Sequence, residues 1–499
     1  MLIFGKIRKI ILFLLLIVFS FSSFAQFDFN ENCKKAYSAI INLKFDEGRK
    51  IIDKEKINNP NNNIINYLEN YIDFLTIIIG QDKNEFRKLE CNKNIRINAL
   101  ENADEDSPYY RYCLANIYLQ WAFARLQFKE YYTATLEINI AYRLLKKNQS
   151  NYPEFMPGYI GLGLLHTIIG SIPDKYKWIV NIIGMDGTIE QGISELQLVL
   201  KDSEINNKNE YLKAESLFFL SIIQLSLKSD KIEAINILPD LDELSGDNPL
   251  KTFSKARILM KTASNDKAIE LLLSSPQNDK SYKFYYLDYL TGIAKLHRFD
   301  KDAVYYFQKY ISNFKGVNYV NDAYQKIAWH YLINGNKVKY FEYINKVSEN
   351  DLVVDTDKQA LKEFKSGIVP NVFLLKARLL FDGGYYEKAI SLLDEIKSED
   401  LENFKDTLEY KYRYARILHE WGKTNKAIEF YNEVIKIGGD KEYYFAANSA
   451  LKSGMIFESK KDFEKARYYY NKCLSLDFDE YKTSITQKAK AGISRIKNK

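Results

Sequence analysis

The sequence predicts an all-α protein in which pairs of helices repeat in tandem and stack into a right-handed superhelix. The chain of 499 residues is 46% hydrophobic and 27% charged, so it carries enough apolar material for a large core. It has only 9 Pro and 22 Gly, which disfavours a β architecture built on many turns. In addition, one helix-pair pattern recurs along the second half of the chain, which is typical of a solenoid.

The recurring pattern is marked by a small residue in the second helix of each pair. This position is occupied in turn by Ala234, Ala268, Ala303, Tyr340, Ala389, Ala427 and Ala466, with spacings of 34, 35, 37, 49, 38 and 39 residues. A large side chain follows four residues later on the same helix face, as in Leu272, Phe307, Leu393, Tyr431 and Tyr470. Another small residue comes twelve positions earlier, at Ala256, Ala377, Ala415 and Gly454. We expect the small residues to let two helices approach and the large ones to fill the seam.

This pattern resembles the tetratricopeptide repeat, whose period is about 34 residues. We therefore expect tandem repeats of this type over residues 201–499; a helical solenoid of another period is the alternative. Residues 26–200 follow the frame less regularly and are expected to form divergent helical repeats. In this half, Gly48, Ala134 and Gly192 occupy the small position.

One apolar, Gly-rich stretch, residues 158–187, interrupts the N-terminal half. Its longest apolar run, Tyr159–Ile172, has 14 residues, fewer than the ~20 that a membrane span needs. Its glycines do not follow the GxGxxG spacing of a dinucleotide site. We expect them to permit close helix packing, with residues 158–170 as the second helix of one pair and residues 173–183 as the first helix of the next.

The same stretch carries a second resemblance. Its glycine-spaced apolar helix is followed by Ile172-Pro173 and by an amphipathic helix that ends in a Gly-containing turn at Gly187 and Gly192-Ile193. Residues Gly158–Ile193 thereby resemble the signature region of the tetratricopeptide repeat protein 39 family and its bacterial relatives. The resemblance implies a non-enzymatic scaffold and carries over no catalytic residue.

The N-terminus has the three parts of a secretory signal peptide. Three cations precede an apolar run, and Ser23 and Ala25 provide the small residues of a cleavage site after Ala25. We expect residues 1–25 to be removed during export; an uncleaved signal anchor is the alternative. The sequence thus predicts a protein of the periplasm or associated with the outer membrane of a bacterium.

The composition and motifs argue against catalysis and cofactors. The chain has no HExxH, GxSxG, Walker or EF-hand motif, and its four histidines have no ligand at metal-binding spacing. A net charge of +6 without a long basic run disfavours nucleic-acid binding. The four cysteines are predicted to be small buried residues on helices, and whether they form disulfides stays open. The cysteines are Cys33, Cys91, Cys113 and Cys473.

A repeated submotif on the first helices indicates a binding surface. "ARIL" or "ARLL" places Arg257, Arg378 and Arg416 directly after a small seam residue. Each arginine is rotated about 100° from that residue and should face the groove of the solenoid. Arg offers bidentate donors for carboxylates, so the groove suits an extended acidic peptide. The further residues expected on this face are Tyr412, His419 and Trp329. The alternative is that each Arg pairs with a nearby Glu or covers apolar surface with its stem.

The function that fits these features best is an exported scaffold or adaptor that holds a protein or peptide partner in its groove. The alternative function is association with a membrane surface through the stretch 158–187. There Trp178, Ile179 and Ile182 lie beside lysines, as in an interfacial helix.

Overall fold

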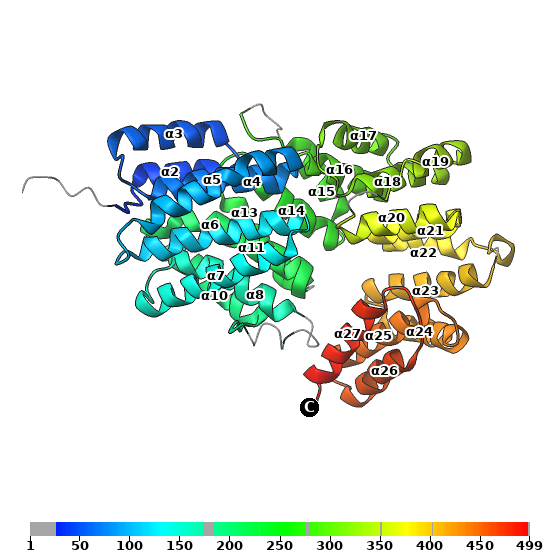
Figure 1. Ribbon diagram of the computed structural model, residues 1–499. Coiled ribbons are helices and arrows are strands. Elements are labelled where there is room, and N and C mark those ends of the chain that lie inside the picture. Colours follow the sequence, from blue (N-terminus) through cyan, green and yellow to red (C-terminus); the bar gives the residue numbers. More distant parts are fainter. Residues whose placement is uncertain are drawn as a thin grey trace, which may run out of the picture. The chain divides into compact units, whose positions relative to one another are not determined.

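The computed structural model describes residues 26–172, 177, 183–228, 230–275, 280–349, 352–401 and 403–497. These residues form helices joined by short turns and contain no strand, so the prediction of an all-α helical-repeat solenoid is confirmed (Figure 1). The predicted signal peptide lies outside the described residues. Within the described ranges, no helix is both long enough and apolar enough to cross a membrane.

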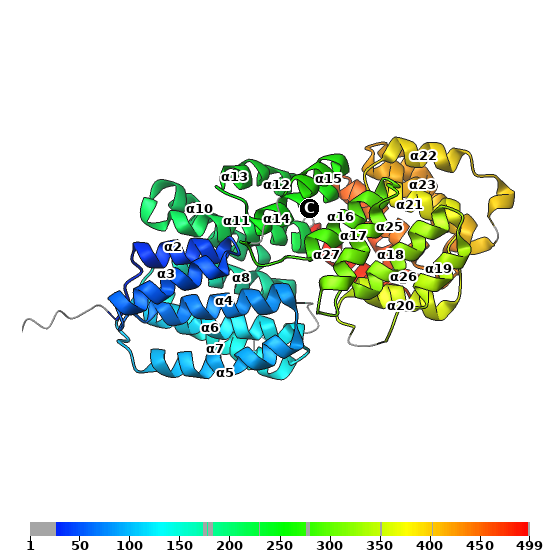
Figure 2. The same ribbon diagram turned by 90° about the horizontal axis from the view of Figure 1, so that it is seen from above.

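The chain forms two compact units, each assembled from separate stretches of sequence (Figure 2). The first unit contains Met1–Thr167, Glu190–Ser216 and Asn278–Tyr282. The second unit contains Ile168–Ile189, Leu217–Gln277 and Lys283–Lys499.

The first unit is built from antiparallel helix pairs. Its helices are α2 (Glu31–Ile41), α3 (Phe45–Asn58), α4 (Ile64–Gly80), α5 (Lys83–Glu101), α6 (Pro108–Gln127), α7 (Tyr131–Asn151) and α10 (Ile189–Ile205), with the 3₁₀ helix η1 (Asn207–Leu212). Helices α8 (Pro157–Ser171) and α11 (Lys213–Ile223) include residues of both units. Helices α4, α6 and α7 lie side by side (Figures 1 and 2). Both Gly48 of α3 and Ala134 of α7 are buried, as their small position in the frame predicts.

Helix α8 packs directly against α10. A Cβ atom on Gly163 of α8 would lie 2.9 Å from the carbonyl oxygen of Gly192 of α10, so the two backbones meet at these glycines. Helix α8 also contacts α7, since a Cβ atom on Gly161 would lie 2.9 Å from the side chain of Leu145. The assignment of residues 158–170 to the second helix of the preceding pair stays a prediction. The glycines do permit close packing, as expected. The predicted intervening helix, residues 173–183, falls mostly outside the described residues.

An aromatic cluster with a buried carboxyl group forms part of the core of the first unit. The phenol groups of Tyr37 and Tyr71 both donate hydrogen bonds to the carboxyl oxygens of Glu215. The two rings pack edge to face with centroids 5.7 Å apart. Burial raises the pKa of Glu215, and the two phenol hydrogen bonds oppose this rise. The carboxyl group is therefore held by phenols in an apolar core, where the protonated form is favoured.

The second unit contains the regular repeats. Its helices are η2 (a π-helical turn, Gln224–Lys228), α12 (Lys231–Asn236), α13 (Leu238–Glu243), α14 (Pro249–Lys261), α15 (Asn265–Ser274), α16 (Tyr286–His297), α17 (Ala303–Asn313), α18 (Val320–Ile333), α19 (Lys337–Ile344), α20 (Asp355–Ser366), α21 (Val372–Asp382), α22 (Tyr386–Asp394), η3 (3₁₀, Ser398–Asp400), α23 (Phe404–Glu420), α24 (Thr424–Gly438), α25 (Tyr444–Ser459), α26 (Phe463–Ser475) and α27 (Lys482–Arg495).

The small and large positions of the repeat frame form the seams of these pairs. Every residue assigned to the small position of the second helix is buried, from Ala234 to Ala466. The large residues four positions later are also buried, and Phe307, Tyr431 and Tyr470 are completely inaccessible to solvent. The irregular spacing of 49 residues between Tyr340 and Ala389 is explained by α20, an additional helix that packs against α18.

The cysteines follow the expected burial with one exception. Cys33, Cys113 and Cys473 are buried and have free thiols. Cys91 lies exposed on α5, which corrects the prediction that all four are buried. The amphipathic pattern of α5 turns this position to solvent.

Replacement of Gly192 by alanine tests the close contact between α8 and α10. The added methyl group would overlap Thr167 Oγ1 and the carbonyl oxygen of Gly163, so the helices must separate. We expect the free energy of unfolding to fall by about 1–3 kcal/mol, as for other overpacked cores. Urea denaturation measures this change. Ser194→Ala, on the exposed face of the same helix, should have little effect, and equal stability of the two variants would contradict the packing.

The buried carboxyl group of Glu215 predicts a pH dependence of stability. Because its folded-state pKa is raised, Glu215 stabilises the fold at low pH, and this contribution is lost as the pH rises through the folded-state pKa. As the pH rises above the ordinary range of a glutamate carboxyl group, the free energy of unfolding of the wild type should therefore fall relative to that of Glu215→Gln. The exposed residue Glu210 supplies the control, because Glu210→Gln should keep the wild-type slope. Parallel curves for all three proteins would contradict the assignment.

Candidate functional site

The three helices that carry the predicted arginines begin at asparagine caps. The side-chain oxygens of Asn248, Asn371 and Asn403 accept hydrogen bonds from backbone N–H groups in the first turns of α14, α21 and α23. Such a cap satisfies donors that the helix cannot satisfy itself and stabilises a helix by about 1 kcal/mol. The caps fix where each helix starts, and hence where its arginine emerges.

Each of the three arginines lies against an aromatic ring. The distances from the guanidinium carbon to the ring centroid are 5.3 Å for Arg257 over Phe253, 5.0 Å for Arg378 over Trp329 and 5.1 Å for Arg416 over Phe381. A guanidinium group that stacks on a ring keeps its N–H donors in its own plane, available to an acceptor at its edge.

Trp329 links two repeats. Ala328 lies twelve residues before Tyr340, so Trp329 occupies the position that Arg378 occupies in the next repeat. Its indole Nε1 donates a hydrogen bond of 2.9 Å to Glu363 of α20. Lys326 Nζ lies 3.8 Å from the ring centroid, in addition to the guanidinium of Arg378. The buried indole is thereby fixed by one hydrogen bond and two cations.

Glu363 is the carboxyl group that α20 adds to this site. It accepts hydrogen bonds from Trp329, from Gln325 Nε2 at 2.7 Å and from the hydroxyl of Tyr340 at 3.1 Å. Burial raises its pKa, although these donors and the charge of Lys326 act in the opposite direction. The additional helix thus orients the tryptophan against which Arg378 stacks.

Arg378 is the more accessible of the two arginines in neighbouring repeats. Its side chain is 42% exposed and lies 3.7 Å from Asp382, at the outer limit of an ion pair. The Arg416 side chain is 20% exposed, and its Nη1 donates a hydrogen bond of 3.2 Å to the hydroxyl of Tyr412. Arg416 also lies 3.8 Å from Glu420.

The remaining predicted residues have different environments. Tyr412 is buried, and His419 Nδ1 lies 3.2 Å from the hydroxyl of Tyr431. Burial lowers the pKa of His419 to about 4, so it is neutral at pH 7. Arg257 donates a hydrogen bond of 3.3 Å to Ser226 Oγ, and its contacts are not shared with Arg378 or Arg416. The structure therefore brings Arg416, Tyr412 and His419 together on α23 and joins Arg378 to Trp329. The predicted interfacial residues Trp178, Ile179 and Ile182 lie outside the described residues.

Several cations near Arg416 were not predicted. Asn448 of α25 donates a hydrogen bond of 2.8 Å to the Tyr412 hydroxyl, and Lys452 follows Asn448 by one helical turn. Lys231 Nζ forms an ion pair of 2.7 Å with Glu420, a contact across 189 residues of sequence. Lys452 could have been found in the sequence, because it lies two residues before Gly454, as Arg413 does before Ala415. No pattern in the sequence predicts the contact between Lys231 and Glu420.

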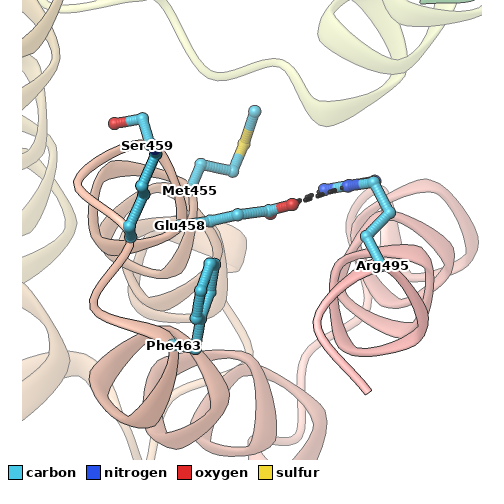
Figure 3. A pocket seen from close by; sticks show the side chains of 6 residues that line it. Met455, Glu458, Ser459, Phe463 and Arg495 are labelled. Atoms are coloured by element: carbon cyan, nitrogen blue, oxygen red, sulfur yellow. Dashed lines mark hydrogen bonds and ion pairs between the residues drawn. The ribbon is translucent and has the colours of Figure 1, made fainter. Parts of the chain in front are cut away.

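A separate cavity of about 420 Å³ opens between α25, α26 and α27 (Figure 3). Met455 and Phe463 contribute to its lining. The guanidinium of Arg495 forms two hydrogen bonds, of 2.7 and 2.8 Å, with the carboxylate of Glu458. The charges of Arg495 and Glu458 neutralise each other, so we expect this ion pair to bind a charged ligand weakly. Across the described ranges, no group of three or more His, Cys, Asp or Glu side chains is placed to hold a metal ion.

Comparison with known proteins identifies the repeat. The family model described as "Tetratricopeptide repeat" matches residues 408–437 and 447–480, which correspond to the pairs α23/α24 and α25/α26. The chain contains tetratricopeptide repeats. The resemblance of residues 158–193 to the tetratricopeptide repeat protein 39 family stays a prediction.

Among solved structures, this tetratricopeptide-repeat protein is similar to the crystal structure of the TPR domain of P58(IPK). The two are 14% identical, the match covers 83% of this chain and 98% of that chain, and the TM-score is 0.21. No curated protein matches the sequence.

Proposed function

We propose that this tetratricopeptide-repeat protein is an exported, non-enzymatic scaffold that binds a protein partner on its arginine surface. We define the arginine surface as Arg378 of α21 and Arg416 of α23, and the buried ring of Trp329 of α18 packs against Arg378. Tetratricopeptide repeats suggest a protein-interaction scaffold, because stacked helix pairs present an extended surface rather than a catalytic pocket. The stacking of Arg378 on Trp329 is the observation that carries the proposal.

The geometry of this pair supports recognition of a partner. Arginine is enriched among the residues that contribute most to protein interfaces. The buried Trp329 ring is held by Glu363 and Lys326, so it fixes the guanidinium group of Arg378 that stacks on it and reduces the freedom that Arg378 loses on binding. Arg378 is 42% exposed and lies 3.7 Å from Asp382, so its N–H donors can reach a carboxylate of the partner.

Export is the second part of the proposal and has a direct test. Because Ser23 and Ala25 form a cleavage site, we expect the protein purified from its native envelope to begin at Gln26. Mass spectrometry of the intact N-terminal peptide measures this. A peptide that still begins at Met1 or continues through Ala25 would remove the basis for export and leave the scaffold proposal unaffected.

The arginine surface is tested by capture of partners from crosslinked envelope. The mature protein should retain a discrete partner that Arg378→Ala/Arg416→Ala loses by at least tenfold, measured by quantitative mass spectrometry. A matched control removes two exposed arginines of the first unit, Arg49 and Arg143, and should retain the partner.

Thermal unfolding of each variant excludes loss of fold as the cause. Equal partner recovery by both double variants would contradict the proposed surface. Recovery of bulk lipid and outer-membrane protein without a discrete partner would favour association with the membrane instead.

A further inference from the structure

The outward side of α7 in the first unit carries a line of exposed apolar side chains. Tyr132, Leu136 and Ile140 follow one another by four residues and are 80, 49 and 39% exposed. On the opposite side of the helix, Ala134 and Ala141 are completely buried, and α7 packs against α6. The seam of the repeat therefore does not need the apolar line.

The same side of α7 continues with positive charge. Arg143 and Lys147 are exposed, and at 100° per residue they lie with the three apolar side chains within an arc of about 80°. From Tyr132 to Lys147, this face extends for about 22 Å along the helix axis. Among the described residues, no carboxylate lies at ion-pair distance from either cation. Both charges are therefore available to an anion outside the described chain.

The exposed side of α7 has no negative charge. The acidic residue of this helix, Glu137, is buried and forms ion pairs with Lys93 of α5 and Arg125 of α6. The exposed side of α3 differs, because acids and bases are interspersed on it. Such a mixed face is typical of a helix in water. A face of apolar and basic side chains without acids is typical of a helix at an anionic membrane surface.

The position of α7 allows a flat surface to reach this side. Helices α5 and α7 lie along one edge of the first unit, and α6 lies between them and α4 (Figure 2). A helix parallel to a bilayer places its apolar side chains about 5–10 Å deep, at the boundary between headgroups and acyl chains. The long stems of Arg143 and Lys147 can reach from that depth back to the lipid phosphates.

We propose that the outward side of α7 binds the surface of an anionic phospholipid bilayer. We define this α7 face as Tyr132, Leu136, Ile140, Arg143 and Lys147. The apolar side chains enter the boundary of the bilayer, and the two cations pair with lipid phosphates. This inference goes beyond the proposed scaffold function, because the arginine surface belongs to the second unit and the α7 face to the first. The α7 face is also separate in sequence from the stretch 158–187, the predicted alternative for a membrane contact.

Cosedimentation with lipid vesicles tests the α7 face. Protein that begins at Gln26 is used, so that the apolar N-terminal run does not contribute. One set of vesicles contains phosphatidylcholine and phosphatidylglycerol in equal parts, and the other contains phosphatidylcholine alone. We expect binding to the anionic vesicles that decreases in high salt, and much weaker binding to the neutral ones. Equal binding to both, or binding to neither, would overturn the proposal.

Two substitutions separate the apolar and the cationic contributions. Leu136→Ser should weaken binding about tenfold, because a partly exposed leucine no longer leaves water on binding. Arg143→Gln should weaken it about fivefold, the effect of one basic residue near an anionic surface. The matched controls Ile57→Ser and Arg49→Gln remove exposed side chains of the same type from α3 and should bind as the wild type does. Equal losses in the variants and their controls would contradict the assignment to α7.

A fluorescent probe shows whether the α7 face enters the bilayer. The environment-sensitive dye NBD is attached to Ile140→Cys in a Cys91→Ser background, because Cys91 is the exposed native thiol. We expect its emission to increase and shift to the blue when anionic vesicles are added. The same dye on Ile57→Cys should not respond. Unchanged emission from the Ile140→Cys conjugate would overturn insertion of this face.

Other occupants of the α7 face, and another lipid contact, give different results. If the face joined two copies of the chain, sedimentation equilibrium would show a wild-type dimer that Leu136→Ser dissociates, and the lipid assignment would fail. If the stretch 158–187 bound the lipid, Trp178→Ser would abolish vesicle binding while Leu136→Ser left it intact. That result would also overturn the α7 face.

Failure of the α7 face is distinguishable from failure of the scaffold proposal. The variant that lacks Arg49 and Arg143 should retain the protein partner in the envelope capture and bind anionic vesicles more weakly. Thermal unfolding verifies that each variant is folded. Loss of vesicle binding by Arg378→Ala/Arg416→Ala, with unchanged binding by Arg143→Gln, would move the lipid contact to the arginine surface and overturn the inference.

Discussion

The repeats depend on one close contact, between a small residue on the first helix of a pair and a large ring on the second. In the last pair, a Cβ atom on Gly454 would lie 2.6 Å from the ring of Tyr470, so no larger residue fits without a shift. The same ring also packs against Gly492 of α27. One ring thereby sets the spacing of three helices. Because protein interiors are close-packed, this spacing also fixes the register of every other side chain on those helices.

Because the register is fixed, the repeat pattern predicts which positions of the first helices are exposed. It does not predict which side chains stand there or what they contact. Trp329 and Phe381 come from the repeat before Arg378 and Arg416, respectively, and each ring receives the arginine of the next repeat. Such a cation–π contact contributes about 0.5–1 kcal/mol at an exposed site. It uses the face of the guanidinium group, while Nη1 of Arg416 donates to the Tyr412 hydroxyl at the edge of that group. For the more exposed Arg378, the contact therefore holds the arginine in place without consuming its capacity to bind a carboxylate.

The sequence predicts the structural features that depend on the seam between the two helices of a pair. It does not predict the features that depend on packing between residues far apart in the chain. The small and large positions around Ala427 and Tyr431 are local, four residues apart, so their burial follows from helix geometry alone. The position of α20, and the hydrogen bond that Trp329 donates to its Glu363, could not be predicted in the same way, because an inserted helix has no fixed place in the repeat frame. The ion pair of Lys231 with Glu420 spans 189 residues, and no local pattern encodes it.

Lys452 of α25 differs from the seam residues in what folding requires of it. The seam needs a small residue at Ala415 and at Gly454, and the structure shows why, since a ring lies against each helix there. Nothing in the packing requires a positive charge at Lys452, where burial and neighbouring cations disfavour the charged form. An uncharged side chain of similar length would fill the same space without this cost. The charge of Lys452 is opposed by burial and by Arg416 and is favoured by the carboxylate of Glu420, so this position tolerates a cation, whereas the seam positions demand small residues.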